Sequence, residues 1–267
     1  MSERHGGTAV ISGASSGFGA IFAEQVASRG MDLVLAGRDE SRLAEVRRRV
    51  REIAPGVQVE LVPGDLGVAG GVAALQAHLA GRAVDLLVNN AGFGTYGAFA
   101  DARAEREHGM VAVNVDALVG LTHAVLPGML TRGAGGIINV ASVIARQPAP
   151  YQATYGASKA FVLSFSQALW AETRGSGVTV TALCPGPTAT GFVGALGSDV
   201  SHTAIYRRLA APEPVVAAGL RALDRGRPVV TPGLRNKVMA SAGGMSPGWL
   251  SALIGKRLLR PAALQMS

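Results

Sequence analysis

Short apolar runs alternate along the chain with longer segments in which apolar residues recur every three or four positions. Seven such runs stand at Ala9–Ser12, Asp32–Ala36, Gln58–Val62, Asp85–Asn89, Gly136–Ala141, Val178–Cys184 and Pro228–Thr231. Continuous apolar runs of this length are typical of strands buried on both faces of a parallel sheet. The pattern therefore predicts an α/β fold with a doubly wound, seven-stranded parallel sheet and helices on both faces.

The segments between these runs have the period of helices. Leu118, Thr122, Val125 and Met129 lie one helical turn apart in a segment that begins near Ala104. We interpret these segments as the helices that cross over between parallel strands.

A further helix is expected from about Tyr155 to Arg174. Its small residues Ala157, Ala160 and Ser164 permit close packing, either on the sheet or against a second subunit. Residues 191–212 are rich in Gly, Ser and Ala and are interpreted as a mobile substrate loop. Residues 234–267 are interpreted as a C-terminal helical extension of one domain that spans residues 1–267.

Composition supports one packed unit in a reducing compartment. Hydrophobic residues make up 48% of the 267 residues and charged residues 16%, the opposite of a disordered composition. Cys184 is the only cysteine, so no intramolecular disulfide forms. We see no export signal and no run of ~20 apolar residues, and therefore expect a cytoplasmic protein.

The net charge of +7 does not indicate nucleic-acid binding. Its densest basic group, Arg42, Arg47–Arg49 and Arg51, lies on one expected surface helix, and aromatic residues are only 5% of the chain. A solvated helix face is the simpler interpretation. The five histidines lack the spacing of metal ligands, so no metal is predicted.

Glycines follow the first strand in the order Gly13, Gly17 and Gly19 and lead directly into a helical pattern. Such residues let the backbone turn tightly and approach a pyrophosphate, whose charge is favoured by the N-terminus of the following helix. The spacing differs from the common dinucleotide fingerprint, so the position between strand and helix carries the argument.

Arg38 ends the second strand, where an acidic residue would select NAD and an arginine accommodates the 2′-phosphate of NADP. No carboxylate precedes it in the strand end Ala36–Arg38. We therefore predict NADP(H) in preference to NAD(H).

Tyr155 and Lys159 are four residues apart and share one face of the expected helix. A lysine charge ~4 Å from a phenol favours the phenolate by about 4 kcal/mol, enough to bring a pKa near 10 toward neutrality. The pair can therefore act as an acid and a base.

Across its whole length the chain resembles the short-chain dehydrogenase/reductase superfamily, with its Rossmann-type fold. The resemblance is carried by the glycines from Gly13 to Gly19, the run Asn89–Gly92, Asn114, Ser142, Tyr155 with Lys159, and Pro185 with Gly186. Their joint occurrence in this order is highly specific, whereas each motif alone is not.

The resemblance implies an oxidoreductase that moves hydride between a nicotinamide and a carbonyl or alcohol. It implies four catalytic residues: Tyr155 as proton donor, Lys159 as its support, Ser142 as a hydrogen-bond donor to the substrate oxygen, and Asn114 as the holder of a relay water. It further implies that Asp65 and Leu66 flank the adenine and that Pro185, Gly186, Thr188 and Thr190 meet the carboxamide.

Together the motifs and the resemblance give the following cofactor-binding residues: Gly13, Ser15, Ser16, Gly17, Phe18, Gly19, Arg38, Asp65, Leu66, Asn89, Ala91, Gly92, Tyr155, Lys159, Pro185, Gly186, Thr188 and Thr190. The family also implies a homodimer or homotetramer. The segments expected to shape the pocket, Phe93–Phe99, Val143–Tyr151 and Phe192–Tyr206, are mostly apolar and favour an apolar ketone or 3-oxoacyl-type substrate.

Other interpretations remain open at this point. A hydrolase using Ser142 would lack the usual glycine-flanked elbow. A catalytically silent NADP-binding regulatory module would not need an intact Ser142, Tyr155 and Lys159. The amphipathic segment Trp249–Arg260 could contact a membrane surface, although such a face usually packs on its own core or on a partner subunit.

Overall fold

The computed structural model describes residues 6–192, 194–196, 203, 209–245 and 247–261. Its strands are β1 (Thr8–Ser12), β2 (Asp32–Gly37), β3 (Val59–Pro63), β4 (Leu86–Asn89), β5 (Gly135–Val140), β6 (Val178–Leu183) and β7 (Val229–Val230). Its longer helices are α1 (Gly17–Ala27), α2 (Glu40–Ile53), α3 (Ala69–Leu79), α4 (Ala104–Val111), α5 (Ala117–Arg132), α6 (Ala153–Glu172), α7 (Pro212–Asp224), α8 (Leu234–Met245) and α9 (Gly248–Leu258). Short helical turns are η1 (Phe99–Asp101), η2 (Ala112–Asp116), η3 (Val143–Arg146) and η4 (Gly194–Leu196).

The strands form one parallel sheet in the order β3-β2-β1-β4-β5-β6-β7. The predicted doubly wound, seven-stranded fold is therefore confirmed, and each strand boundary lies within one residue of the expected one. The order reverses between β1 and β4. In open α/β sheets, ligands bind beside the carboxyl ends of the strands at such a reversal.

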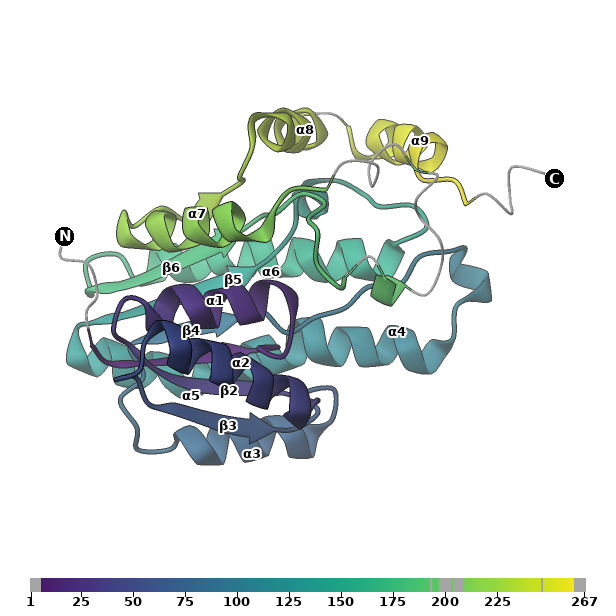
Figure 1. The fold of residues 1–267 in the computed structure, drawn as a ribbon. Coiled ribbons are helices and arrows are strands. Elements are labelled where there is room, and N and C mark those ends of the chain that lie inside the picture. The colour runs from purple at the N-terminus through teal and green to yellow at the C-terminus, as the bar shows by residue number, and fades with distance from the viewer. Residues whose placement is uncertain (1–5, 193, 197–202, 204–208, 246, 262–267) are drawn as a thin grey trace.

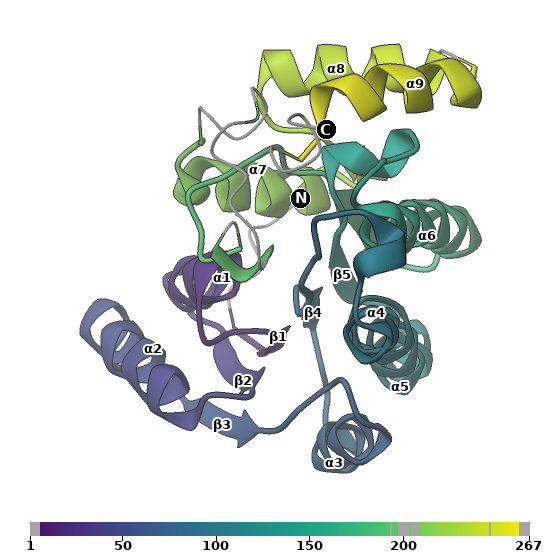
Figure 2. The ribbon, with the colours of Figure 1, turned by 90° about the vertical axis from the view of Figure 1, so that its right-hand side faces the viewer.

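Helices cover both faces of the sheet, as Figures 1 and 2 show. One core lies between the sheet and α1, α2 and α7, with Phe22 and Leu35 fully buried. The second core lies under α3, α5 and α6 and contains Leu121, Val125 and Met129. Both faces of the central strands are thus buried, which explains their continuous apolar sequences.

The helix from Ala104 to Arg132 is the one described segment that is long and apolar enough to cross a membrane. Core helices meet the same criterion. Here Leu121, Val125 and Met129 are buried against the sheet, so the apolar composition of this helix is explained by its place in the core.

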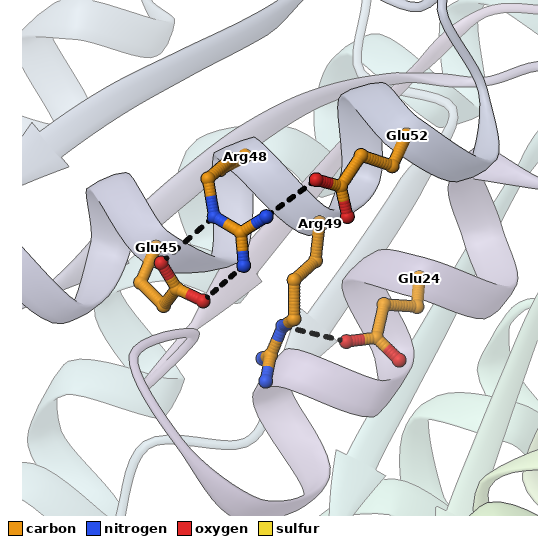
Figure 3. A network of polar contacts seen from close by, with 5 residues as sticks. All are labelled: Glu24, Glu45, Arg48, Arg49 and Glu52. Carbon is orange, nitrogen blue, oxygen red and sulfur yellow. Dashed lines mark hydrogen bonds and ion pairs between the residues drawn. The ribbon is translucent and has the colours of Figure 1, made fainter.

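The arginine cluster of α2 is largely paired with carboxylates (Figure 3). Arg48 forms ion pairs with Glu45, at 2.7 Å, and with Glu52 on the same helix, while Arg49 reaches Glu24 of α1 at 3.1 Å. These pairs offset the positive charge locally. Counting Arg42, which pairs with Asp39, three of the five clustered arginines have a carboxylate partner.

Helices α8 and α9 lie outside the two helical layers, beyond the end of the sheet where β6 and β7 are (Figures 1 and 2). Glycines let them approach the polypeptide beneath. A Cβ atom on Gly243 would lie 2.2 Å from Oε1 of Gln147, and one on Gly255 would lie 3.1 Å from Pro150. Of the predicted substrate loop 191–212, residues 193, 197–202 and 204–208 lie outside the described residues.

Candidate active site

A cavity of about 820 Å³ opens along the carboxyl edge of the sheet. Its lining includes all but two of the predicted cofactor residues, the exceptions being Gly19 and Asn89. The segments after β1, β2, β3, β4, β5 and β6 all contribute to it. The sheet therefore brings together motifs that lie up to about 170 residues apart in the sequence.

The glycine-rich turn forms one end of this cavity. Gly13 and Gly17 have φ angles of +65° and +54°, which residues with a Cβ rarely adopt. Ser16 precedes α1 without capping it through its side chain, so the first N–H groups of the helix remain available to an anion. Gly19 lies behind the turn, where a Cβ would come within 2.1 Å of the Gly13 carbonyl oxygen. The lack of a Cβ at Gly19 is therefore required by close packing of the turn, and its contact with a cofactor stays a prediction.

Asn90 holds this turn in place, and sequence reasoning missed it. Its Nδ2 donates to the carbonyl oxygens of Ser12 and Gly13, each at 3.0 Å. The Ser12 hydroxyl in turn accepts hydrogen bonds from the backbone N–H groups of Asn90 and Ala91.

Asn89, which was predicted to bind the cofactor, lies on the other side of the backbone. Its Nδ2 donates to Thr122 Oγ1 and Asn139 Oδ1, both at 2.9 Å, so it links β4 to α5 and β5. The alternation of side chains along a strand gives adjacent asparagines these different surroundings.

Arg38 lines the cavity, as do Ser15, Ser16 and Arg42. The carboxylate of the neighbouring Asp39 is engaged elsewhere. It accepts from the backbone N–H of Arg42 at 3.0 Å, which caps α2, and forms an ion pair with Arg42 Nε at 3.2 Å. Within the described part of the chain Arg38 has no ion pair, so its guanidinium is available to an anionic group.

Asp65 and Leu66 also line the cavity. Asp65 Oδ1 accepts from the backbone N–H of Gly67 at 2.8 Å, which fixes the turn after β3. Leu66 is buried and offers an apolar surface there.

Tyr155 and Lys159 project from the first turns of α6 into the middle of the cavity, and both are buried. Lys159 Nζ lies 5.9 Å from the centroid of the Tyr155 ring and donates to the Val140 carbonyl oxygen at 2.8 Å. Burial lowers the pKa of Lys159 to about 8. An ammonium with so few partners is costly to bury and is therefore a candidate for a functional role.

Ser142 lines the cavity at the end of β5. It caps η3, where its Oγ accepts from the backbone N–H of Ile144 at 3.4 Å. Because that contact uses only an oxygen lone pair, the Ser142 hydroxyl proton can point into the cavity.

Asn114 lies beneath the cavity lining, in a π-helical turn between α4 and α5. Its Oδ1 accepts from the N–H of Phe93 at 3.1 Å, and its Nδ2 donates to the Phe93 carbonyl oxygen and to Ser158 Oγ, both at 3.0 Å. Such bulges occur frequently at functional sites. The side chain thus ties the Gly92–Phe93 loop to α6 one residue from Lys159.

The segment after β6 also lines the cavity and meets the glycine-rich turn at Thr190, 3.2 Å from where a Cβ on Gly17 would lie. Pro185 accepts from the N–H of Val143 at 3.0 Å, and Thr188 Oγ1 donates to the Gly186 carbonyl oxygen at 2.8 Å. Asn236 of α8 packs so closely on Gly186 that a Cβ there would lie 2.4 Å from its Oδ1. The predicted carboxamide loop is therefore held directly by the C-terminal helices.

The remaining end of the cavity is mainly apolar. Its lining includes Val143, Ile144, Phe192, Met239, Ile254 and Leu258. The Phe192 ring lies 5.2 Å from that of Tyr155. Sequence reasoning expected the contributions near Val143 and Phe192 but not those of α8 and α9, because nothing in their local pattern says which side faces the cavity.

Cys184 lies behind this wall. It is fully buried, and burial raises the pKa of its thiol to about 11. This is consistent with a small buried apolar residue rather than a nucleophile.

Comparison with known proteins identifies the family of the chain. The family model described as short chain dehydrogenase matches residues 7–201. Hydroxysteroid dehydrogenase-like protein 1 from Gallus gallus is 31% identical over 98% of this chain and 80% of its own length.

Two solved structures give the same result. A short-chain dehydrogenase from Sphingobium yanoikuyae in complex with NADPH is 38% identical, with a TM-score of 0.80 over 88% of this chain and 92% of that one. A short chain dehydrogenase/reductase from Burkholderia phymatum in complex with NAD is 30% identical, with a TM-score of 0.80 over 90% and 94% of the two chains. The chain therefore belongs to the short-chain dehydrogenase family of oxidoreductases, which act on alcohols and carbonyl compounds.

Proposed function

We propose that this chain is an NADP(H)-dependent reductase of apolar ketones or 3-oxoacyl-type compounds, with Tyr155 as the proton donor. The observation that carries the proposal is the single cavity in which Ser142, Tyr155 and Lys159 lie between a glycine-rich anion site and an apolar wall. The glycine-rich turn, the uncapped N-terminus of α1 and Arg38 fit a dinucleotide phosphate.

In the proposed carbonyl reduction each of these residues has a distinct role. A bound nicotinamide supplies the hydride. The Ser142 hydroxyl and the Tyr155 phenol hold the carbonyl oxygen, and Tyr155 gives it a proton as negative charge develops there. The Lys159 ammonium stabilises the phenolate that remains, while Pro185, Gly186, Thr188 and Thr190 hold the carboxamide side.

Replacing Tyr155 with Phe tests the proton donor. The change removes one hydroxyl from a buried ring, so we expect kcat for NADPH-dependent ketone reduction to fall by about 10³-fold, near the middle of the usual range for general acids. The variant should still bind NADPH, which can be measured by the quenching of protein fluorescence. Turnover near the wild-type rate would refute the assigned role.

Arg38 tests the cofactor preference, because relatives bind either NADPH or NAD. For Arg38→Ala we expect kcat/KM with NADPH to fall by about 10- to 100-fold, the loss of one or two charge-assisted hydrogen bonds, with little change for NADH. The matched control is Arg51→Ala, which removes an exposed arginine of the same region that does not line the cavity. Equal losses for both cofactors would contradict NADP preference.

A hydrolase based on Ser142 has no support in this cavity. Its described lining contains no histidine that could act as a base for the serine.

A further inference from the structure

Helices α8 and α9 expose an unusual amount of apolar surface. Among the described residues fourteen large hydrophobic side chains are exposed, and seven of them are on these two helices. The seven are Leu234, Val238, Trp249, Leu250, Leu253, Ile254 and Leu258, with exposed fractions from 38% to 79%. We call these seven side chains the C-terminal apolar patch. From the sequence, this face was expected to pack on the protein's own core or on a partner subunit, and in the single chain these seven side chains are exposed.

The same part of the chain holds all of the net charge. Up to Asp224 the sequence has 18 basic and 18 acidic residues, whereas after Asp224 it has seven basic residues and no acidic one. Lys237, Lys256 and Arg257 are exposed on α8 and α9 themselves. The two helices that carry the apolar patch therefore also carry exposed positive charge, with no acidic residue after Asp224 in the sequence to balance it.

The side of α9 that faces the protein already packs against other parts of the chain. Ser251 and the adjoining Leu259 are buried, and Gly255 lies against Pro150. The outward side carries Trp249 and Leu253 next to Lys256 and Arg257. A helix with one face docked on protein and the other apolar with basic residues beside it has the composition of interfacial membrane helices.

We propose that α8 and α9 bind to the surface of an anionic lipid bilayer. Trp249 and its apolar neighbours enter the boundary between headgroups and acyl chains, and the lysines and arginines lie among the lipid phosphates. Long basic side chains suit this position because their aliphatic stems stay in the apolar zone while their charges reach the headgroups.

A second copy of the chain is a poorer occupant of the patch. In a two-fold dimer formed through the patch the same surface meets itself, so the exposed Lys237, Lys256 and Arg257 of both copies would be brought together. Like charges placed opposite one another across an interface oppose association. An anionic bilayer compensates them instead.

Bilayer binding would also place the cavity beside the lipid. Ile254 and Leu258 line the cavity and are at the same time 50% and 53% exposed, so they lie at its rim. An apolar carbonyl compound could then enter from the membrane, a consequence that rests on the proposed function. The membrane proposal itself does not.

The test is flotation of the purified full-length protein with lipid vesicles in the absence of cofactor and substrate. We expect co-flotation with vesicles of phosphatidylcholine containing 30% phosphatidylserine, and much less with pure phosphatidylcholine. In a Trp170→Phe background, the fluorescence of Trp249 should shift to the blue on binding, because this side chain is 67% exposed in the free protein.

Two double variants separate the contribution of the basic residues from that of the apolar residues to vesicle binding. Neither variant changes a residue that lines the cavity. Lys256→Gln/Arg257→Gln should lower the partition coefficient about 30-fold, since each basic residue near an anionic surface contributes roughly fivefold. Trp249→Ser/Leu253→Ser should lower it at least about tenfold. The matched control Arg51→Gln/Arg221→Gln removes the same net charge from exposed positions elsewhere and should stay within about twofold of wild type.

The proposal is overturned if wild-type protein binds both vesicle types equally, or if the control variant loses as much binding as Lys256→Gln/Arg257→Gln. It is also overturned if wild-type protein does not float but elutes as an oligomer that Trp249→Ser/Leu253→Ser dissociates, because the patch would then be a protein interface. Ketone reduction, measured separately with a water-soluble substrate, distinguishes these outcomes from failure of the proposed activity.

Discussion

The sheet and the C-terminal helices break the usual separation of apolar and charged residues in opposite ways. Around the sheet, the apolar side chains are buried as expected, yet Lys159 places an ammonium among them. On α8 and α9 the basic residues are exposed as expected, yet the apolar side chains beside them are exposed too. Each exception adjoins the same cavity.

This contrast separates two origins of functional surface. A buried charge costs folding free energy, so it persists where chemistry needs it. An exposed apolar patch has little effect on the folding of the single chain and is informative about what the chain contacts. The buried charge is tested by measuring stability and activity in the same variant. The exposed apolar patch is tested by measuring what the protein binds.

The largest effect is expected from Lys159→Met, which removes the buried charge while keeping the apolar stem. Activity should fall by about 10³-fold or more, because Tyr155 loses its supporting ammonium. The free energy of unfolding at pH 7 should nevertheless rise by about 1–2 kcal/mol. The lowered pKa corresponds to a burial cost of about 3 kcal/mol, part of which is cancelled by the lost hydrogen bond to Val140. Urea denaturation and NADPH oxidation measure the two quantities.

The dependence of stability on pH gives the control. Because the pKa of Lys159 falls from 10.5 to about 8 on folding, the unfolded chain holds more protons between these values. The wild-type free energy of unfolding should therefore rise with pH through this window, with the full cost present below pH 8. Lys159→Met should lack this rise. A variant less stable than wild type at pH 7 with an unchanged slope would show that the ammonium is well accommodated.

Two leucines allow the regions to be compared directly. Leu35 of β2 is fully buried and Leu253 of α9 is 56% exposed. Leu35→Ala should cost about 2–5 kcal/mol of stability through cavity formation. Leu253→Ala should change stability by no more than about 0.5 kcal/mol. Urea midpoints measured at equal slopes would check both, and comparable losses would mean that the C-terminal apolar patch belongs to the core.

The fold could be predicted from the sequence where the pattern of buried positions along the chain is that of a strand or a helix. Strands such as β1 and β4 are buried on both faces, so their apolar runs identify them without any tertiary information. The seventh strand, β7, has only two residues, Val229 and Val230, and its expected extent was longer because a sequence pattern does not register where pairing with β6 stops.

The candidate site residues could be predicted where a motif fixes both the type of residue and the side of the helix or strand from which its side chain projects. Tyr155 and Lys159 share a helical face by spacing alone, and both reach the cavity. Asn89 and Asn90 are identical in type, and only the register of β4 decides that Asn90 holds the glycine-rich turn. The contacts of α8 with Gly186 and Gln147 join segments some 50 to 100 residues apart, which no local pattern encodes.

The smallest effect concerns the hydrogen bond that joins the two regions. Tyr96, in the loop after β4, donates its phenolic proton to the Leu259 carbonyl oxygen at 2.9 Å, and both residues are buried. Tyr96→Phe keeps the ring and leaves that carbonyl without this donor, at a cost of about 1 kcal/mol. Because the segment after α9 can open without unfolding the sheet, the loss should be local. Amide hydrogen exchange in residues 248–261 should quicken about fivefold while β1 and β4 exchange at their former rates. If amide exchange in the strands quickens equally, α9 belongs to the cooperative unit of the sheet. If exchange is unchanged everywhere, the packing of Tyr96 and Leu196, not the hydrogen bond, holds the C-terminal helices in place.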